Sequence, residues 1–278
     1  GNIYVSGRFT ASVNFDPLNS NTTIDAIGPI DTYILKLNPD GEFVWVKQVG
    51  GNGGTIALDL VYDSENLIIT GRFENVVDFD PGIDAFNVSS NGNLDAYILK
   101  LNKDGEFIWI NSLGGTIGEL GISSVVDGDG NIYTTGKTSS SFSMELIDGG
   151  SATVTNQGIS DIYVVKFNSE GEAIWLKSYG GTGNAIGFDV DVDNNGHLFL
   201  VGQIQDSCFF ENDLITVDGT NALTMKLDSD GVIQWINSLG GNLNDVGRSI
   251  SVNNYNEIFV CGEFQDTMNL NSNQYISN

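Results

Sequence analysis

Four tryptophans at nearly equal spacing constrain the fold of this chain more than any other feature. The only tryptophans are Trp45, Trp109, Trp175 and Trp235, which lie 64, 66 and 60 residues apart. Each is followed five residues later by a Gly-Gly pair, and each ends a copy of one phrase: DTYILKLNPDGEFVW, DAYILKLNKDGEFIW, DIYVVKFNSEGEAIW and NALTMKLDSDGVIQW. A period of this length predicts a repeat protein, in which each unit packs against copies of itself.

A second phrase follows each Gly-Gly pair and confirms the period. Its copies are ENLIITGRF, GNIYTTGKT, GHLFLVGQI and NEIFVCGEF, and GNIYVSGRF opens the chain. We therefore expect about four and a half repeats of roughly 64 residues in a single domain over 1–278. Their approximate boundaries are 1–50, 51–114, 115–180, 181–240 and a partial 241–278. Because the chain starts inside one repeat and stops inside another, we expect a fragment of a longer protein or a partial assembly.

Inside a repeat the pattern predicts antiparallel strands. The β-rich stretches 97–101 and 106–110 flank an Asn-Lys-Asp-Gly turn, and 121–126 and 131–135 flank Asp-Gly-Asp-Gly, so each pair is predicted to form a hairpin. Large apolar residues then recur six and eight positions beyond the strand-ending Gly, which predicts one more short strand. No segment has the pattern of a long helix.

The tryptophan strand indicates how the sheets are covered. Phe107 and Trp109 lie on one face, and Ile108 and Ile110 lie on the other. A strand with one solvated face alternates apolar and polar residues, so we expect these sheets to be covered on both faces. The unit is also shorter than an immunoglobulin-like sandwich of roughly 100 residues. We predict an all-β fold, a β-propeller of four-stranded antiparallel blades.

The repeated phrases closely resemble the bacterial seven-bladed β-propeller repeats known as SBBP repeats. The resemblance rests on D-x-Y-[IV]-[LV]-K-[LF]-N-x-[DE]-G, on W-x(4)-G-G and on D-x(2)-G-N-[IL]-Y-x-[TS]-G, and it covers essentially the whole chain. The fourth repeat departs from it at Asn221, where the other copies have Asp. The Val-Asp-Phe-Asp-Pro-Gly segment at 77–82 is similar to a subtype found in large secreted or surface proteins, often exported by the type IX route. The resemblance implies an extracellular or outer-surface location and no transferable catalytic motif.

Asp127, Asp129 and Asn131 place oxygen ligands at alternate positions, as a calcium loop does. The twelfth position, where an EF-hand has Glu, is Thr138, and strands rather than helices flank the segment. The other copies vary in a way that fits a turn, in which Asp and Asn bond their own backbone. We favour the turn and keep calcium as the alternative.

A second candidate cation site is predicted on the first strand after each Gly-Gly pair, which a propeller places innermost. Asp59, Asp189 and Asp191 lie on such strands. Carboxylates that line one polar channel either raise each other's pKa or bind a cation.

Few residues offer a reaction centre. His197 is the only histidine and occupies a turn position, so we interpret it as a surface substitution. Cys208 and Cys261 fall in apolar strand positions, and we favour two buried thiols over a disulfide. The repeated tryptophans and the repeated lysines at 36, 100, 166 and 226 are interpreted as structural, with each lysine directed toward an acid of its own or the next blade. We expect no enzyme and no cofactor.

The charge excludes some partners. The chain has 36 acidic and 11 basic residues, a net charge of −25, which argues against binding to nucleic acid or to an anionic membrane. No apolar run approaches the ~18 residues of a membrane span.

We expect a scaffold, adhesion or recognition module that binds protein or glycan at the loops 18–29, 82–94 and 148–160, alongside other domains of a longer chain. The alternatives are a carbohydrate- or calcium-binding module and a polysaccharide-acting enzyme.

One modification site is also predicted. Thr267 lies in a short Asp-Thr-Met sequence that resembles a bacterial O-glycosylation motif.

Overall fold

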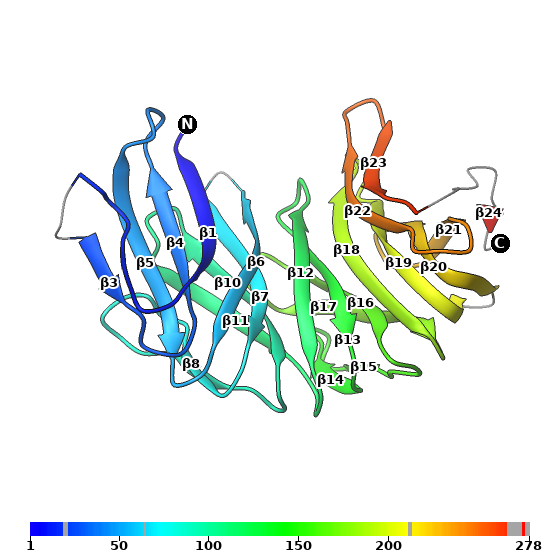
Figure 1. Cartoon of the computed structure of the whole chain (residues 1–278), viewed down its shortest axis with the longest axis horizontal. Helices are drawn as coiled ribbons and strands as arrows, with labels where there is room; N and C mark the ends of the chain where they lie inside the picture. The colour runs from blue at the N-terminus through cyan, green and yellow to red at the C-terminus, as the bar shows by residue number, and fades with distance from the viewer. Residues whose placement is uncertain (19–21, 64, 211–212, 266–273, 276–278) are drawn as a thin grey trace. The chain divides into compact units, whose positions relative to one another are not determined.

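The computed structural model describes residues 1–18, 22–63, 65–210, 213–265 and 274–275, and every regular element in this part of the chain is a β-strand (Figure 1). No α-helix occurs there, so none is long and apolar enough to cross a membrane. The prediction of an all-β fold is confirmed. The chain divides into two compact units, Gly1–Gly121 and Ile122–Asn278, and the boundary falls within β12 (Glu119–Val126). The single domain expected over 1–278 stays a prediction.

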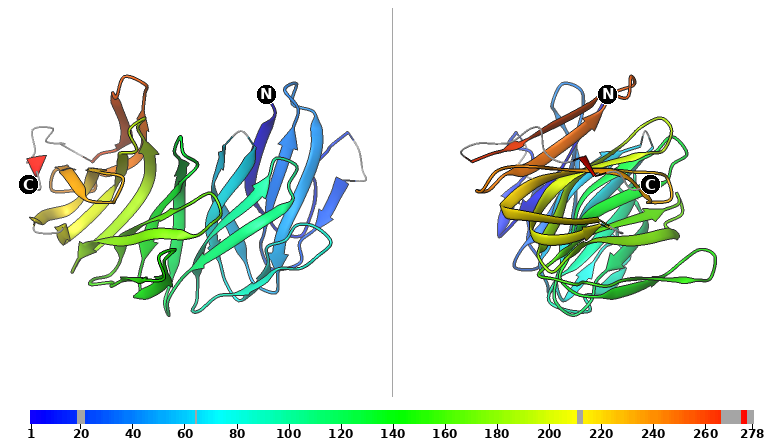
Figure 2. Two further views of the ribbon diagram at one scale, coloured as in Figure 1. Left: turned by 180° about the vertical axis from the view of Figure 1, so that it is seen from behind. Right: turned by 90° about the vertical axis from the view of Figure 1, so that its right-hand side faces the viewer.

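The first unit contains two main antiparallel sheets. One has the order β1-β4-β5-β8-β9, and the other is the four-stranded sheet β11-β10-β7-β6, drawn in cyan to blue-green (Figures 1 and 2). A separate small hairpin joins β2 to β3. The strands are β1 (Ile3–Phe9), β2 (Ser12–Asn14), β3 (Thr23–Asp25), β4 (Asp31–Leu37), β5 (Phe43–Gly51), β6 (Thr55–Tyr62), β7 (Asn66–Phe73), β8 (Val76–Asp78), β9 (Asn87–Ser89), β10 (Asp95–Asn102) and β11 (Phe107–Leu113).

The second unit repeats the same plan. Here β12-β13-β16-β17 and β18-β19-β20-β21 belong to one nine-stranded sheet, in which β17 also pairs with β19 and β21 pairs with β24. Separate hairpins join β14 to β15 and β22 to β23. The strands are β13 (Ile132–Thr138), β14 (Phe142–Glu145), β15 (Ser151–Val154), β16 (Asp161–Phe167), β17 (Ala173–Gly181), β18 (Asn184–Val192), β19 (Leu198–Phe210), β20 (Asp213–Leu227), β21 (Ile233–Leu239), β22 (Val246–Val252), β23 (Ile258–Glu263) and β24 (Gln274–Tyr275).

The predicted hairpins form, and their register is the same in every repeat. The third strand of a repeat pairs with the tryptophan strand so that a lysine lies opposite each tryptophan, as Lys100 does with Trp109. A register shift directly follows that lysine in all four copies. The additional short strand appears as β2, β8 and β14, and as the end of β19. Its apolar residues are buried at Val77, Phe79 and Phe210.

The middle strands are buried on both faces, whereas the tryptophan strands are not. Every residue of β10 except Asn102 is buried. In contrast, Val44 on β5 is 45% exposed and Ile108 on β11 is 44% exposed. The prediction that the tryptophan strand is covered on both faces is therefore wrong at these positions. The reason is that β11 is the end strand of its four-stranded sheet, and β5 pairs with β8 only at Gly50 and Gly51, so each tryptophan strand has fewer neighbours along most of its length.

The Gly-Gly pair is explained by a buried acid at the start of the third strand. Asp161 is 2% exposed, and its Oδ1 accepts a hydrogen bond from Gly181 N at 3.1 Å, while its Oδ2 accepts one from Gln157 N at 2.9 Å. A Cβ on Gly180 would overlap the Asp161 carboxylate. The same close approach recurs between Gly50 and Asp31, between Gly114 and Asp95, and between Gly240 and Asn221.

Backbone hydrogen bonds join consecutive repeats. In the first three of four such bonds, the residue that precedes the third strand of one repeat accepts from the start of the first strand of the next repeat. In the fourth bond, Thr220 lies within β20 and the donor, Asp245, directly precedes β22. The four bonds run from Thr55 N to Ile30 O (2.9 Å), from Glu119 N to Leu94 O (2.9 Å), from Ala185 N to Ser160 O (2.8 Å) and from Asp245 N to Thr220 O (2.7 Å).

The repeated lysine and tryptophan also bond to the next repeat. Lys36 Nζ lies 3.2 Å from Asp104 Oδ1 in the turn between β10 and β11, as expected for a lysine directed toward an acid of the next sheet. In the second unit, Lys166 Nζ and Trp175 Nε1 both donate to Ser229 O, at 3.5 and 3.0 Å. These residues therefore stabilise the stacking of sheets.

Candidate functional site

The first candidate cation site is a closed hydrogen-bonded turn between β12 and β13. Asp127 Oδ1 accepts from Asp129 N at 3.0 Å and Asn131 N at 2.9 Å. Asp127 Oδ2 accepts from Asn131 Nδ2 at 2.8 Å and Tyr133 Oη at 3.1 Å. The structure thus brings Asp127, Asp129 and Asn131 together, and it uses the Asp127 carboxylate to close the turn, as Asp side chains commonly do.

Hydrogen bonds within two of the repeated turns favour the ionised form of the first acid, Asp127 in one turn and Asp193 in the next. Burial by itself raises the pKa of Asp127, but the hydrogen bonds from Asn131, Tyr133 and Asp129 outweigh it and leave that pKa below its usual value. The same balance, with His197 as the main donor, lowers the pKa of Asp193. Accepting several hydrogen bonds favours a carboxylate over the protonated acid.

His197 takes the place of Asn131 in the next copy of this turn. Its Nδ1 lies 2.9 Å from Asp193 Oδ2, and its backbone N donates to Asp193 Oδ1 at 2.9 Å. The Asp193 side chain is 3% exposed and the His197 side chain 34% exposed. The interpretation as a turn substitution fits this geometry, because the imidazole makes the contact that the Asn131 amide makes with Asp127.

The two turns line a pocket of about 380 Å³ that includes Asp127, Asp129 and Asp193. Lys166 also lines it, with its Nζ 5.0 Å from the centroid of the Tyr133 ring. Within the described part of the chain, no group of three or more His, Cys, Asp or Glu side chains comes together as a metal cluster. The calcium site therefore stays a prediction.

The three acids of the second candidate cation site, Asp59, Asp189 and Asp191, make separate hydrogen bonds. Asp189 on β18 accepts from Ser123 Oγ at 2.8 Å through Oδ1, and from Ser249 Oγ at 2.7 Å and Ile250 N at 2.9 Å through Oδ2. Asp189 therefore bonds β18 to both β12 and β22.

The other two acids of that set also bond to backbone. Asp191 Oδ2 accepts from Val252 N on β22 at 2.7 Å. Asp59 lies on β6 in the first unit, and its Oδ1 accepts from Leu60 N at 2.8 Å. Asp189 and Asp191, which the sequence offered only as candidate cation ligands, therefore join the first strands of successive repeats by hydrogen bonds.

The two cysteines differ, and neither forms a disulfide. Cys208 is buried, and burial raises the pKa of its thiol to about 11. Cys261 is exposed, so the prediction of two buried thiols is wrong for Cys261. It lies on β23, which among the described residues pairs with β22 and with no further strand. Thr267, the predicted glycosylation site, lies outside the described residues.

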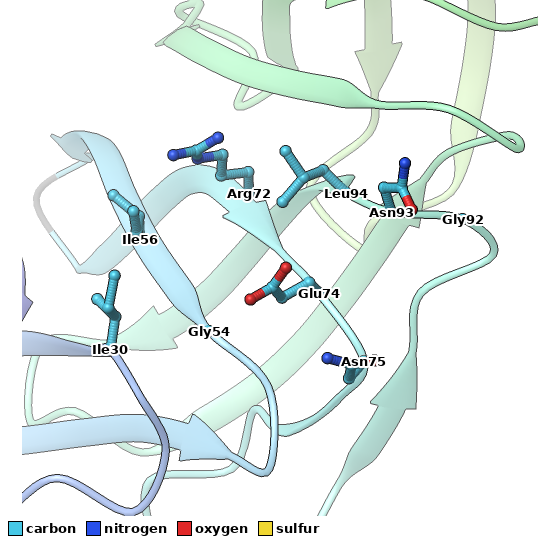
Figure 3. Close-up of a pocket in the computed structure, with 9 residues that line it drawn as sticks. All are labelled: Ile30, Gly54, Ile56, Arg72, Glu74, Asn75, Gly92, Asn93 and Leu94. Carbon is cyan, nitrogen blue, oxygen red and sulfur yellow. The ribbon is translucent and has the colours of Figure 1, made fainter.

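A pocket of about 390 Å³ in the first unit was not predicted from the sequence (Figure 3). The apolar side chains of Ile30, Ile56 and Leu94 line its sides (Figure 3). Between them lie the side chains of Arg72, on β7, and Glu74, which directly follows β7 (Figure 3). The remaining lining residues are Gly54, Asn75, Gly92 and Asn93. The pocket therefore combines an aliphatic surface with one cation, one anion and two amides.

The loops around this pocket are held by hydrogen bonds. Glu74 N donates to Gly54 O at 3.0 Å. Asn75 and Ser90 bond twice, from Asn75 N to Ser90 Oγ at 3.0 Å and from Ser90 N to Asn75 O at 2.9 Å. Asn91 N donates to Asp95 Oδ2 at 3.0 Å. The lining side chains are consequently presented by a connected backbone.

One signal in the sequence points to this pocket. The residue after the strand-ending Gly is basic in three successive repeats, at Arg8, Arg72 and Lys137, but an acid two positions later occurs at Glu74 alone among those three. Residues two apart on a strand project from the same face, so this pair marks the second repeat as different.

No family model matches the chain. In an alignment 200 residues long that covers 62% of this chain, it is 24% identical to an uncharacterized WD repeat-containing protein of Acanthamoeba polyphaga mimivirus. The match spans 14% of the length of that viral protein, so the chain is similar to a small part of it.

Proposed function

We propose that the chain is a β-propeller, or a part of one, that acts as a non-catalytic interaction scaffold. The four-stranded meander β6-β7-β10-β11 has the order of a propeller blade, and the same order recurs in β12-β13-β16-β17. The first strand of a sheet also packs on the preceding sheet, as β18 does on β13 and β16. The WD repeat relative supports the same architecture, since WD repeats build propeller blades.

One observation carries the role as a scaffold: a constant frame presents unlike connections. The close approach of a glycine to Asp or Asn and the backbone hydrogen bond to the next repeat recur in all four copies, whereas the connection between the second and third strands changes. It is β8–β9 in one repeat, β14–β15 in the next and a long continuous hairpin of β19 and β20 in the fourth. Loops that vary on a rigid frame are the usual place for recognition.

The proposal includes a secreted or surface location in a bacterial protein, supported by the SBBP-like phrases. It also includes further domains in a longer chain and a protein partner in preference to a glycan. The aliphatic and charged lining of the pocket in Figure 3 supports the preference for protein, because its lining residues include no aromatic platform for a sugar.

The proposed role is tested by exchanging a variable connection. Residues 80–85, between β8 and β9, are replaced by a Gly-Ser linker of equal length, and residues 146–150, between β14 and β15, are replaced in the same way in a matched variant. Protein partners are identified by photo-crosslinking and mass spectrometry with the wild-type chain, and their binding to each variant is then measured. We expect one exchange to abolish binding of a purified partner while the unfolding midpoint changes little. A chain that binds no purified protein, or that degrades polysaccharide in a glycan screen, would refute the proposal.

Calcium binding is the second candidate, favoured by the pocket that Asp127, Asp129 and Asp193 line. Calorimetric titration with calcium after chelation tests it, and Asp129→Asn is the informative variant because the Asp129 backbone, not its carboxylate, closes the turn. Heat release that Asp129→Asn removes would support this candidate, and a flat titration of the wild-type chain would exclude it.

A further inference from the structure

The pocket in Figure 3 contains an arginine that the fold leaves available. Among the described residues, the Arg72 side chain makes no hydrogen bond or ion pair, although acids outnumber bases more than threefold in this chain. Three other basic side chains pair with carboxylates among the described residues: Lys36 with Asp104, Lys103 with Glu65 and Arg248 with Glu263. Arg72 is half-buried, so its guanidinium is partly withdrawn from water without an anion beside it. A guanidinium in that state favours an incoming carboxylate.

The residues next to Arg72 limit which kinds of anion can bind in this pocket. Glu74 lies two residues further along the same chain segment and carries a negative charge into the same pocket. Glu74 repels a doubly charged phosphate more strongly than a singly charged carboxylate. With one carboxylate on Arg72, Glu74 can accept N–H groups of the same ligand.

The apolar lining adds a second requirement. Ile30, Ile56 and Leu94 line the pocket beside the charged pair, and Ile56 is 8% exposed. A ligand therefore gains most if an aliphatic side chain enters next to its carboxylate, since a buried Leu or Ile side chain contributes roughly 1.5–3 kcal/mol by transfer. Asn75 and Asn93 are exposed and carry both donors and acceptors, which match the backbone of a peptide.

We infer that this pocket binds a short peptide segment of a partner protein in which an aliphatic residue stands next to Asp or Glu. The carboxylate pairs with Arg72, the aliphatic side chain packs on Ile30, Ile56 and Leu94, and Glu74, Asn75 and Asn93 bond to the peptide backbone. The inference rests on the proposed role as an interaction scaffold and names the partner chemistry of one site.

Selection from a phage library of random heptapeptides on the full chain tests the inference. We expect enrichment of sequences with Leu, Ile or Val adjacent to Asp or Glu. Binding of the enriched peptide, measured by calorimetry, is expected to weaken at least tenfold in Arg72→Gln. Arg8→Gln is the matched control, because Arg8 occupies the same repeat position, is exposed and does not line the pocket. Its affinity should equal that of the wild-type chain.

A charge-reversal variant tests whether the peptide carboxylate pairs specifically with Arg72. Arg72→Glu should reject the acidic peptide and recover affinity for the same peptide with Lys in place of the acid. Thermal unfolding of each variant verifies that it is folded. Enriched peptides that bind Arg72→Gln as tightly as wild type would overturn the pocket assignment while leaving the scaffold role standing. Enrichment of basic peptides, enrichment of none, or binding of glycans that Arg72→Gln abolishes would overturn the peptide inference.

Discussion

Gly180 lies against the carboxylate of Asp161 so closely that a side chain at this glycine would overlap it. The acid is buried at the start of β16, and the next residue of the pair, Gly181, donates its N–H to it. The same arrangement recurs with a buried acid at Asp31 and Asp95, and with the partly buried Asn221 in the fourth repeat. The Gly-Gly signature is therefore a packing requirement, and in this repeat its second glycine is also a backbone donor for the acid.

Gly180→Ala should destabilise the chain by about 1–3 kcal/mol, because a methyl group must displace the Asp161 carboxylate from its partners. The free energy of unfolding from urea titration is the measurement. Gly128→Ala is the control, since a Cβ at Gly128 would contact nothing within 4 Å. Equal stability of the two variants would contradict the packing explanation.

Trp175 and Trp45 differ in whether the indole N–H has a hydrogen-bond acceptor. Trp175 Nε1 donates to Ser229 O at 3.0 Å, whereas Trp45 Nε1 is buried and has no acceptor among the described residues. Trp175→Phe should therefore be about 1 kcal/mol more destabilising than Trp45→Phe, which removes an unsatisfied donor. Chemical unfolding of both variants measures the difference. If Trp45→Phe is the more damaging of the two, the hydrogen bond to Ser229 does not stabilise the stacking.

The lowered pKa of Asp127 makes its contribution depend on pH. Because the folded-state pKa lies below the unfolded-state value, the stabilisation is present above the unfolded-state pKa and is lost as pH falls through the folded-state pKa. Asp127→Asn should thus be less stable than wild type at pH 7, by about 1–2 kcal/mol, and the difference should shrink on acidification. Unfolding titrations from pH 7 down to pH 3 test this, with the exposed Asp40→Asn as control. A difference that grows on acidification would contradict it.

The two thiols should react at very different rates. Cys261 is exposed, and Cys208 is buried with its pKa raised to about 11, so its thiolate is scarce at pH 8. Maleimide labelling followed by mass spectrometry should add one label to the native chain and a second after denaturation. In Cys261→Ser the native chain should stay unlabelled. Native labelling of Cys208 in that variant would show that the β19–β20 region opens in solution.

The sequence by itself determined the period, the strands and their turns. Tryptophans 64, 66 and 60 residues apart and turn residues at fixed offsets are local or periodic signals, and local signals specify hairpins such as β10–β11. For the same reason His197 and Asp127 could be placed in turns from the sequence. The short strand at Val76–Asp78 was likewise predictable from its alternating apolar residues.

Tertiary structure decided which repeated residues meet. No spacing reveals that Asp161 contacts Gly180, that Asp189 bonds to Ser123 and Ser249, or that Val44 and Ile108 are exposed to solvent. The pocket of Arg72 and Glu74 also needs Ile30 from the preceding repeat and Leu94 from a loop. Such contacts join residues far apart in the chain, and they depend on how sheets pack rather than on the pattern within any one strand.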